Sequence, residues 1–273
     1  MSLICLVTAM TAEAKPLIRH FNLEALPQSG LSAWKGDGVC LVQTGMGAQR
    51  AAARLDALLS VQLGITAFIN VGIAGGDREL GEVILASSVV DKTTDRRWYP
   101  QLPPSSVVDF VDHSEVVTVA TPCTNYRTDS VYDMEAAAVT RVASQHTELS
   151  RIHTVKVISD NPSHPLDDFS VKNVTPWMCN TLPTVEALIH WLSTHQKSTV
   201  VEEFCRQVNT LSSHITDVCH HSVTESYQLR RLLERYLALH GRLPSIENLG
   251  PLDSSRKVLQ KLEHELVSYR INY

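Results

Sequence analysis

The strongest constraint on the fold is an alternation of short apolar runs with helical stretches along residues 1–195. The runs are almost continuously apolar, which is typical of strands that are covered on both faces. They predict strands at 3–7, 39–43, 67–71, 82–90, 116–120 and 154–159, and helical spacing predicts helices at 11–20, 47–63, 134–148 and 182–195. This order of elements predicts a three-layer α/β domain.

From about Thr199 the pattern changes to helices alone. Two capping boxes, Thr199-x-x-Glu202 and Ser222-x-x-Glu225, each predict the start of a helix, because their side chains can satisfy free backbone N–H groups of the first turn. Gly241 is placed to end the second of these helices, since glycine readily takes the left-handed conformation.

These boundaries predict an α/β domain over residues 1–196 and a helical extension over 197–273, whose third helix runs from 253 or 254 to 269. The extension has ten basic and nine acidic residues, which favours packing or dimerisation over nucleic-acid binding. The residues expected to face inward are Phe204, Val208, Leu211, Ile215, Val218, Leu229, Leu232, Leu233, Tyr236, Leu237, Leu259, Leu262 and Leu266.

Length and composition limit the class of protein. A chain of 273 residues with 44% apolar content can bury a sizeable core. The formal net charge is -5 and the basic residues are scattered, so nothing favours nucleic acid or an anionic membrane as a partner. Neither a signal peptide nor a run of the ~20 apolar residues that a membrane helix needs is recognisable. The six cysteines show no CxxC spacing, which favours reduced thiols and a cytoplasmic location.

Three acidic residues, Glu13, Glu135 and Asp160, each follow a short apolar run, in VTAMTAE, YDMEAAA and VKVISDN. The carboxyl ends of strands in an α/β sheet converge on one crevice, which could gather three carboxylates around one sugar. The alternatives are a surface glutamate in the first helix, a solvated glutamate in a later first turn, and an aspartate that caps a helix.

Two glycine clusters follow predicted strands. Gly45-Met46-Gly47 could begin a dinucleotide-binding fingerprint, but Arg50 stands where the third glycine is required, and a tight turn from strand to helix is the alternative. Gly72-Ile73-Ala74-Gly75-Gly76 either lets the backbone approach a flat ligand closely or turns the chain.

Taken in order, VTAMTAE, TGMG, NVGIAGG with LGEV after it, DMEAAA and VISDN resemble the motifs of the purine nucleoside phosphorylase superfamily. Within it, the chain is most similar to the nucleosidases that cleave methylthioadenosine and adenosylhomocysteine. The resemblance covers about residues 2–192 and stops at the helical extension. It implies a nucleoside phosphorylase-type fold with a mixed, partly closed central sheet, a homodimer, and no metal or organic cofactor.

The resemblance also implies roles for single residues. Asp160 would be the general acid that protonates N7 of a purine, and Glu13 would orient and deprotonate the attacking water. Glu135, with Met134 against the sugar, would hold the ribose hydroxyls. The further residues that it places at the substrate are Ser159, Gly72, Ile73, Ala74, Gly75 and Lys156. The implied activity is hydrolysis of the N-ribosidic bond of a purine nucleoside to free base and a ribose derivative.

Two departures bear on the nucleophile. Phosphorylases of the superfamily hold phosphate with an arginine and a serine where this chain has Asn70 and Ile73, so water is the favoured nucleophile. Ile73 also departs from the small polar residue that is usual in the nucleosidases. Lys156 stands where these carry an arginine near the water, which keeps the charge but loses the planar fork.

A third departure is a shortened segment between Ser88 and Asp133. Thr121–Tyr126 occupy the place of the loop that contacts the base, without a clear counterpart of its stacking aromatic residue. Tyr126 or Trp98 could substitute for it, or either could be structural. A phosphate-dependent phosphorylase and a nucleoside-binding module without turnover therefore stay open as alternatives.

His214, Cys219, His220 and His221 gather at the end of one predicted helix. No second pair of ligands stands at a spacing typical of zinc sites, so we expect no metal ion there. The expected partner is a small-molecule nucleoside, and neither nucleic acid nor a membrane is expected to bind.

Overall fold

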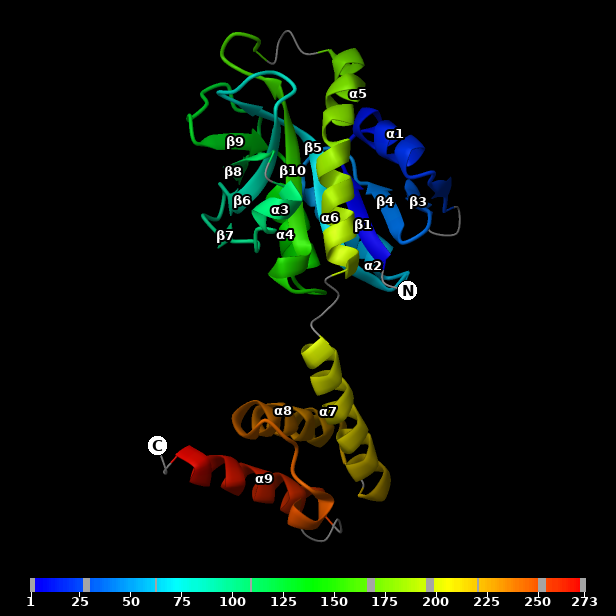
Figure 1. Cartoon of the computed structure of the whole chain (residues 1–273), viewed down its shortest axis with the longest axis vertical. Helices are drawn as coiled ribbons and strands as arrows, with labels where there is room; N and C mark the ends of the chain where they lie inside the picture. The colour runs from blue at the N-terminus through cyan, green and yellow to red at the C-terminus, as the bar shows by residue number, and fades with distance from the viewer. Residues whose placement is uncertain are drawn as a thin grey trace. The chain divides into compact units, whose positions relative to one another are not determined.

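The structure is a computed structural model and describes residues 3–26, 30–61, 63–108, 110–165, 170–194, 199–219, 221–249 and 254–270. The chain divides into two compact units, Met1–Thr194 and His195–Tyr273 (Figure 1). Each unit has a hydrophobic core of its own.

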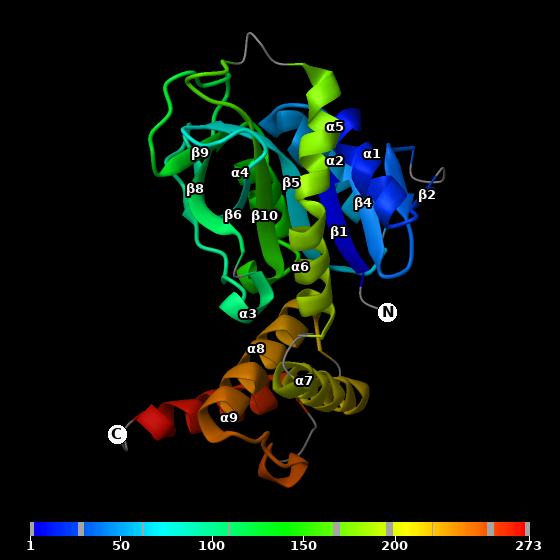
Figure 2. The same cartoon turned by 45° about the horizontal axis from the view of Figure 1, so that its top comes forward.

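The described part of the first unit is built on one mixed sheet of ten strands (Figure 2). The strands are β1 (Leu3–Thr8), β2 (Glu24–Ala25), β3 (Ala33–Lys35), β4 (Val39–Gln43), β5 (Ile65–Gly76), β6 (Val83–Asp91), β7 (Arg97–Trp98), β8 (Asp112–Thr118), β9 (Ser130–Asp133) and β10 (Ile152–Asp160). Their order is β10-β6-β8-β9-β5-β1-β4-β3-β2, with β7 beside β6. Because β10 also pairs with β5, the strands β5, β9, β8, β6 and β10 form a closed ring. The predicted mixed, partly closed sheet is confirmed.

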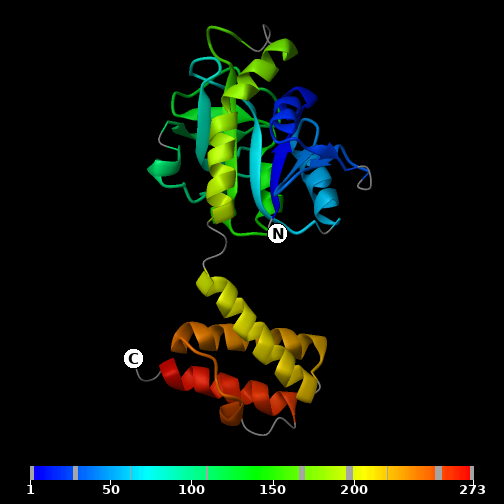
Figure 3. The same ribbon diagram turned by 45° about the vertical axis from the view of Figure 1, so that its right-hand side comes forward.

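Helices cover both faces of this sheet (Figure 3). They are α1 (Thr11–His20), α2 (Ala48–Leu59), α3 (Ser105–Val108), α4 (Ala136–Ala143), α5 (Val171–Asn180) and α6 (Leu182–Thr194). Along β1, Ile4 and Leu6 pack in the cluster that contains α1, α5 and α6, whereas Cys5 and Val7 pack with α2 and α4. Burial on both faces explains the continuously apolar strands and confirms the three-layer prediction.

All six predicted strands are present, as β1, β4, β5, β6, β8 and β10. β5 is longer than predicted, because it continues through Gly72 to Gly76 while pairing with β10 on one side and β9 on the other. The glycine cluster therefore does not turn the chain. The sequence did not predict β2, β3, β7 and β9, which are two to four residues long, or α5, which contains Pro176.

The second unit consists of α7 (Thr199–Val218), α8 (Val223–His240) and α9 (Ser255–Arg270), with a short 3₁₀ turn at Ile246–Leu249. The predicted capping box of α8 is confirmed, because Ser222 Oγ accepts a hydrogen bond from the Glu225 N–H, and the Glu225 carboxylate accepts one from the Ser222 N–H. Gly241 ends this helix with a φ of 67°, as predicted.

Most of the described residues expected to face inward form the core of this unit, including Val208, Ile215, Leu233 and Leu262. Val218 is an exception. Its side chain, on the last residue of α7, is 58% exposed, so the prediction for it was wrong. The side chains of Thr199, Glu202 and Phe204, and all of His220, lie outside the described residues. In the part of the chain that the structure describes, no helix has the length and apolarity needed to cross a membrane.

His153, on β10, is a buried titratable side chain in the first unit. Its ring lies edge-on to that of Trp191, with the centroids 5.5 Å apart. Burial lowers the pKa of His153 to about 4, since the charged imidazolium would lose its hydration in this environment. The neutral form is therefore the one that the fold accommodates.

The substitution His153→Phe tests this reading, because phenylalanine keeps a ring in the site but cannot titrate. In the unfolded chain His153 binds a proton below about pH 6.5, so the parent protein should lose roughly 3 kcal/mol of folding free energy between pH 7 and pH 4 that the variant does not lose. Chemical denaturation of both proteins at several pH values measures the difference. Parallel stability curves would contradict the assignment.

Candidate active site

Three acidic residues from different parts of the chain meet at one cavity of about 290 Å³. Asp160 is the last residue of β10, Glu135 follows β9, and Glu13 lies in α1 just after β1. The other predicted residues that line the cavity are Met134, Ser159, Ile73, Ala74 and Gly75. Eight of the ten predicted site residues are thus brought together, whereas Gly72 and Lys156 are buried and do not belong to the lining.

Glu13 is fixed by backbone N–H groups. Ala9 and Met10 each donate to Oε2 at 2.8 Å, and Ile73 donates to Oε1 at 3.0 Å. Burial raises the pKa of Glu13, and these donors only partly offset it. With 2% exposure, Glu13 is not the surface residue that the sequence left as an alternative.

Glu135 is held by the first glycine cluster. Gly45 and Gly47 have φ angles of 84° and 97°, a conformation that favours glycine, and the Gly47 N–H donates to Glu135 Oε1 at 2.6 Å. The cluster is therefore a turn from β4 to α2, and its backbone binds the Glu135 carboxylate. Burial, reinforced by the neighbouring Asp133 carboxylate, raises the pKa of Glu135 to about 7.

Asp133 is a buried residue of the site that the sequence did not predict. Lys156 Nζ contacts its Oδ2 at 2.7 Å, and both side chains are almost fully buried. The same oxygen accepts from the Ala136 N–H at 2.7 Å, so Asp133 caps α4, and Thr118 Oγ1 donates to Oδ1 at 2.6 Å. Burial alone would lower the pKa of Lys156, but Asp133 and Glu135 outweigh it and raise the pKa.

Two signals in the sequence could have found this pair. An aspartate three residues before an alanine-rich helix is a capping pattern, and a lysine inside the apolar strand TVKVIS needs a buried partner. The resemblance placed Lys156 near the attacking water. The structure instead places Lys156 against Asp133, away from the lining of the cavity.

Asp160 is held by two hydroxyl groups. Ser159 Oγ donates to Oδ1 at 2.6 Å, and the Tyr126 hydroxyl donates to Oδ2. Of the two aromatic residues considered for the base, Trp98 belongs to a hydrophobic core cluster and Tyr126 reaches Asp160. Tyr132, which the sequence did not single out, is the aromatic residue among the described residues of the lining.

The second glycine cluster leaves space for the side chains of two of these acids. A Cβ atom on Gly72 would lie 2.8 Å from Oε1 of Glu13, and one on Gly75 would collide with Oδ2 of Asp160. Neither glycine has a positive φ, so the need is for space and not for an unusual backbone conformation. The cluster thus allows a close approach to its backbone, as predicted, but the groups that approach it are carboxyl groups of this chain.

Comparisons with known proteins agree with this architecture. The Phosphorylase superfamily matches residues 3–122. A 5′-methylthioadenosine nucleosidase of Arabidopsis thaliana superposes with a TM-score of 0.60 at 22% identity, over 70% of this chain and 96% of that one. The first unit has the fold of the phosphorylase superfamily. The resemblance predicted from the motifs is therefore confirmed.

Two further solved structures share this superfamily fold. A 5′-methylthioadenosine/S-adenosylhomocysteine nucleosidase of Colwellia psychrerythraea in complex with adenine gives a TM-score of 0.57 at 18% identity, over 70% of this chain and 96% of that one. The futalosine hydrolase of Helicobacter pylori gives 0.56 at 14% identity, over 68% and 97% of the two chains. No curated protein matches the sequence.

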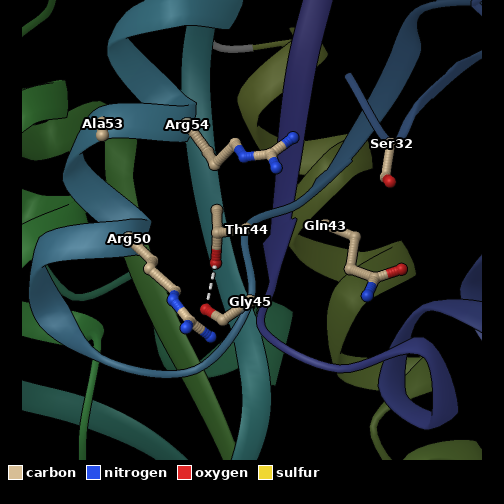
Figure 4. Close-up of a pocket in the computed structure, with 7 residues that line it drawn as sticks. All are labelled: Ser32, Gln43, Thr44, Gly45, Arg50, Ala53 and Arg54. Carbon is tan, nitrogen blue, oxygen red and sulfur yellow. Dashed lines mark hydrogen bonds between the residues drawn. The ribbon is translucent and has the colours of Figure 1, made fainter. Parts of the chain in front are cut away.

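A second cavity, of about 300 Å³, lies between α2 and the end of β4 (Figure 4). Arg50 and Arg54 extend from α2 beside it, and Thr44 Oγ1 donates to the Gly45 carbonyl oxygen at 3.0 Å. None of the three predicted acids lines it. Glu13, Glu135 and Asp160 all line the other cavity.

The variant Gly72→Ala tests how Glu13 is accommodated. The added methyl group should overpack the site and lower the free energy of unfolding by roughly 1–3 kcal/mol. The shorter side chain of Glu13→Asp leaves space for that methyl group, so the double variant should lose less stability than the sum of the two single variants. Chemical denaturation of all four proteins measures this coupling, and additive losses would contradict the assigned contact.

Proposed function

We propose that the chain hydrolyses the N-ribosidic bond of a purine nucleoside, with a methylthioadenosine- or adenosylhomocysteine-like compound as substrate. The observation that carries this proposal is the cavity shared by Glu13, Glu135 and Asp160. Cleavage of a ribosyl C–N bond needs a proton for the departing base, a grip on the sugar and a nucleophile. The three carboxyl groups can supply one function each.

Asp160 is the proposed general acid. A proton from its carboxyl group goes to N7 of the purine as the C–N bond breaks, so that the base leaves as a neutral molecule. Ser159, which donates to Oδ1 at 2.6 Å, fixes the orientation of the carboxyl group. Both residues lie at the end of β10 and line the cavity.

Glu135 is the proposed ribose clamp. In its ionised form it can accept hydrogen bonds from the two ribose hydroxyls, and its charge favours the positive charge that develops on the sugar. The Gly47 N–H already holds Oε1, which leaves Oε2 to face the substrate. Met134, also in the lining, offers an apolar contact for the sugar.

Glu13 is the proposed base for the attacking water. Three of the four acceptor positions of its carboxylate are used by backbone N–H groups, so one is left for a water molecule. The raised pKa of Glu13 makes it a better proton acceptor than an ordinary glutamate.

Several features favour water over phosphate as the nucleophile. No arginine or lysine is found among the described residues that line the cavity. At the positions where phosphorylases hold the anion, Asn70 directs its amide to the Val7 carbonyl oxygen at 3.2 Å, and Ile73 is apolar. An anion would therefore lack a charged partner.

The variant Asp160→Asn tests the proposed acid. Incubation of a panel of purine nucleosides with the protein, followed by quantification of free base, should show a rate at least ~100-fold below that of the parent. The matched control is Asp129→Asn, which changes an exposed aspartate outside the cavity lining and should leave the rate unchanged. Equal rates for Asp160→Asn and the parent would remove this residue from the mechanism.

The same panel separates the alternatives. Hydrolysis proceeds without phosphate, whereas a phosphorylase forms ribose 1-phosphate only when phosphate is present. Tight nucleoside binding without release of base over hours would indicate a binding module instead. A homodimer and a cytoplasmic location remain predictions from the sequence, and sedimentation can test the first of them.

The pH dependence tests Glu135. Because the pKa of Glu135 is about 7 in the empty site, its ionised form is lost as the pH falls through 7, and kcat/KM should fall about tenfold per pH unit below that point. In Glu135→Gln the overall rate should drop and this limb near pH 7 should disappear. An unchanged limb in the variant would assign it to another group.

A further inference from the structure

The second cavity, between α2 and the end of β4, carries basic and polar groups that no step of the proposed hydrolysis uses. Two arginines, Arg50 and Arg54, and two polar side chains, Ser32 and Gln43, belong to its lining. No acidic residue is among the described residues of that lining. Its volume of about 300 Å³ lies at the lower end of the range for small-molecule sites. The cavity thus has the size and the charge for a small anion.

The two arginines lie on one face of α2. They are four positions apart, so their Cβ atoms are about 5–6 Å from each other. Both are exposed, and neither forms an ion pair or a side-chain hydrogen bond with any residue that the structure describes. Two like charges at this spacing repel each other and slightly destabilise a helix. An anion bound between them would replace this repulsion by attraction.

The wall beside Arg50 is fixed by contacts within the protein. A Cβ atom on Gly45 would lie 3.5 Å from Cδ of Arg50, so the aliphatic part of the arginine lies over this glycine. The Gly45 N–H donates to the Ala9 carbonyl oxygen at 3.0 Å, and its own carbonyl oxygen accepts from Thr44 Oγ1 at 3.0 Å. The backbone under the arginine is therefore in place before any ligand arrives.

Further hydrogen-bond donors face the cavity from the strands. Figure 4 shows Arg50 and Arg54 extending from α2 on one side, with Ser32 and Gln43 on the other. Thr11 Oγ1 donates to Gln43 Oε1 at 3.3 Å, which orients the amide and leaves its nitrogen as a donor. The Ser32 side chain is exposed, and its hydroxyl can also donate. An anion in this cavity would meet donors on both sides.

We propose that the second cavity binds a phosphate group, free or carried by a small molecule, and that Arg50 and Arg54 are its ligands. The planar fork of an arginine matches two oxygens of a phosphate, and two forks one helical turn apart can reach the same group. A phosphate monoester carries about -1.5 to -2 charges at pH 7, which two guanidinium groups can balance. A carboxylate has a single charge and would leave one of them unpaired.

This site differs from the anion site that a phosphorylase would need beside its sugar. None of its described lining residues lines the proposed active site. The turn from β4 to α2 nevertheless contributes to both cavities, because Gly45 lines the second and Met46 lines the other. In the same turn, the Gly47 N–H donates to Glu135. The inference goes beyond the proposed function and does not depend on it.

The first test is isothermal titration calorimetry of the full-length protein with inorganic phosphate and with glycerol 3-phosphate. Sodium chloride at the same ionic strength is the control for general effects of salt. Saturable binding at one site per chain is expected. Tighter binding of the ester would assign a phosphorylated small molecule, and tighter binding of the free ion would assign inorganic phosphate, and both support the site. Heats equal to those of sodium chloride for both probes would overturn the proposal.

The second test repeats the titration with variants of the two arginines. Arg50→Gln and Arg54→Gln should each weaken binding at least ~10-fold, because charge-assisted hydrogen bonds are lost. Arg50→Lys keeps the charge without the fork and should weaken binding less than Arg50→Gln. The matched control is Arg19→Gln, which removes an exposed arginine of α1 outside both linings. Equal losses in Arg19→Gln and Arg50→Gln would overturn the proposal in favour of a general attraction between charges.

The second site and the proposed function fail separately. If the parent cleaves no nucleoside but binds phosphate through the two arginines, the proposed function is wrong and the second site stands. If the parent cleaves nucleosides and phosphate binding is unchanged in both glutamine variants, the second site is wrong and the function stands. The melting temperature of each variant shows that it has folded, as expected for substitutions of exposed side chains.

Discussion

The buried ion pair between Lys156 and Asp133 is the interaction on which the rest of the candidate site depends. Its atoms are 2.7 Å apart and neither side chain can turn toward water, so removal of one partner would leave a buried charge at a cost of about 3–5 kcal/mol. The Asp133 carboxylate also caps α4 and accepts from Thr118. Through these contacts it fixes the start of the helix beside Glu135, and so the position of the proposed ribose clamp.

The charges around this pair bear on the pKa of two neighbouring glutamates. One ammonium group faces the carboxyl groups of Asp133, Glu135 and Glu13. Asp133 lies only 2.7 Å from the Lys156 ammonium group and takes up most of its stabilising charge. At Glu13 and Glu135 the effect of burial therefore prevails, and the pKa of both is raised. Raised pKa values of buried carboxyl groups around one cavity are typical of sites that move protons, which is the physical link between the fold and the proposed hydrolysis.

Much of the fold could be predicted because it depends on patterns that are local. β1 and β10 are apolar on both faces, the box at Ser222 satisfies N–H groups of its own first turn, and Gly241 takes the left-handed conformation that ends a helix. β9 could not be predicted, since four residues carry no period and the strand exists only through its pairing with β5 and β8. The ion pair of Asp133 and the contact of Tyr126 with Asp160 were not predicted, because the partners are 23 and 34 positions away.

By itself, the sequence determined the α/β order of elements, the superfamily motifs and the three acids at strand ends, since each of these is written in a short window of residues. Only the tertiary structure decided what surrounds those acids. It showed that Gly72 and Gly75 leave space for the side chains of Glu13 and Asp160. It also showed that Lys156 forms an ion pair with Asp133 and that Tyr126 donates a hydrogen bond to Asp160. The physical reason is that burial and hydrogen bonding depend on neighbours in space, and chains bring those neighbours together from positions that no local pattern connects.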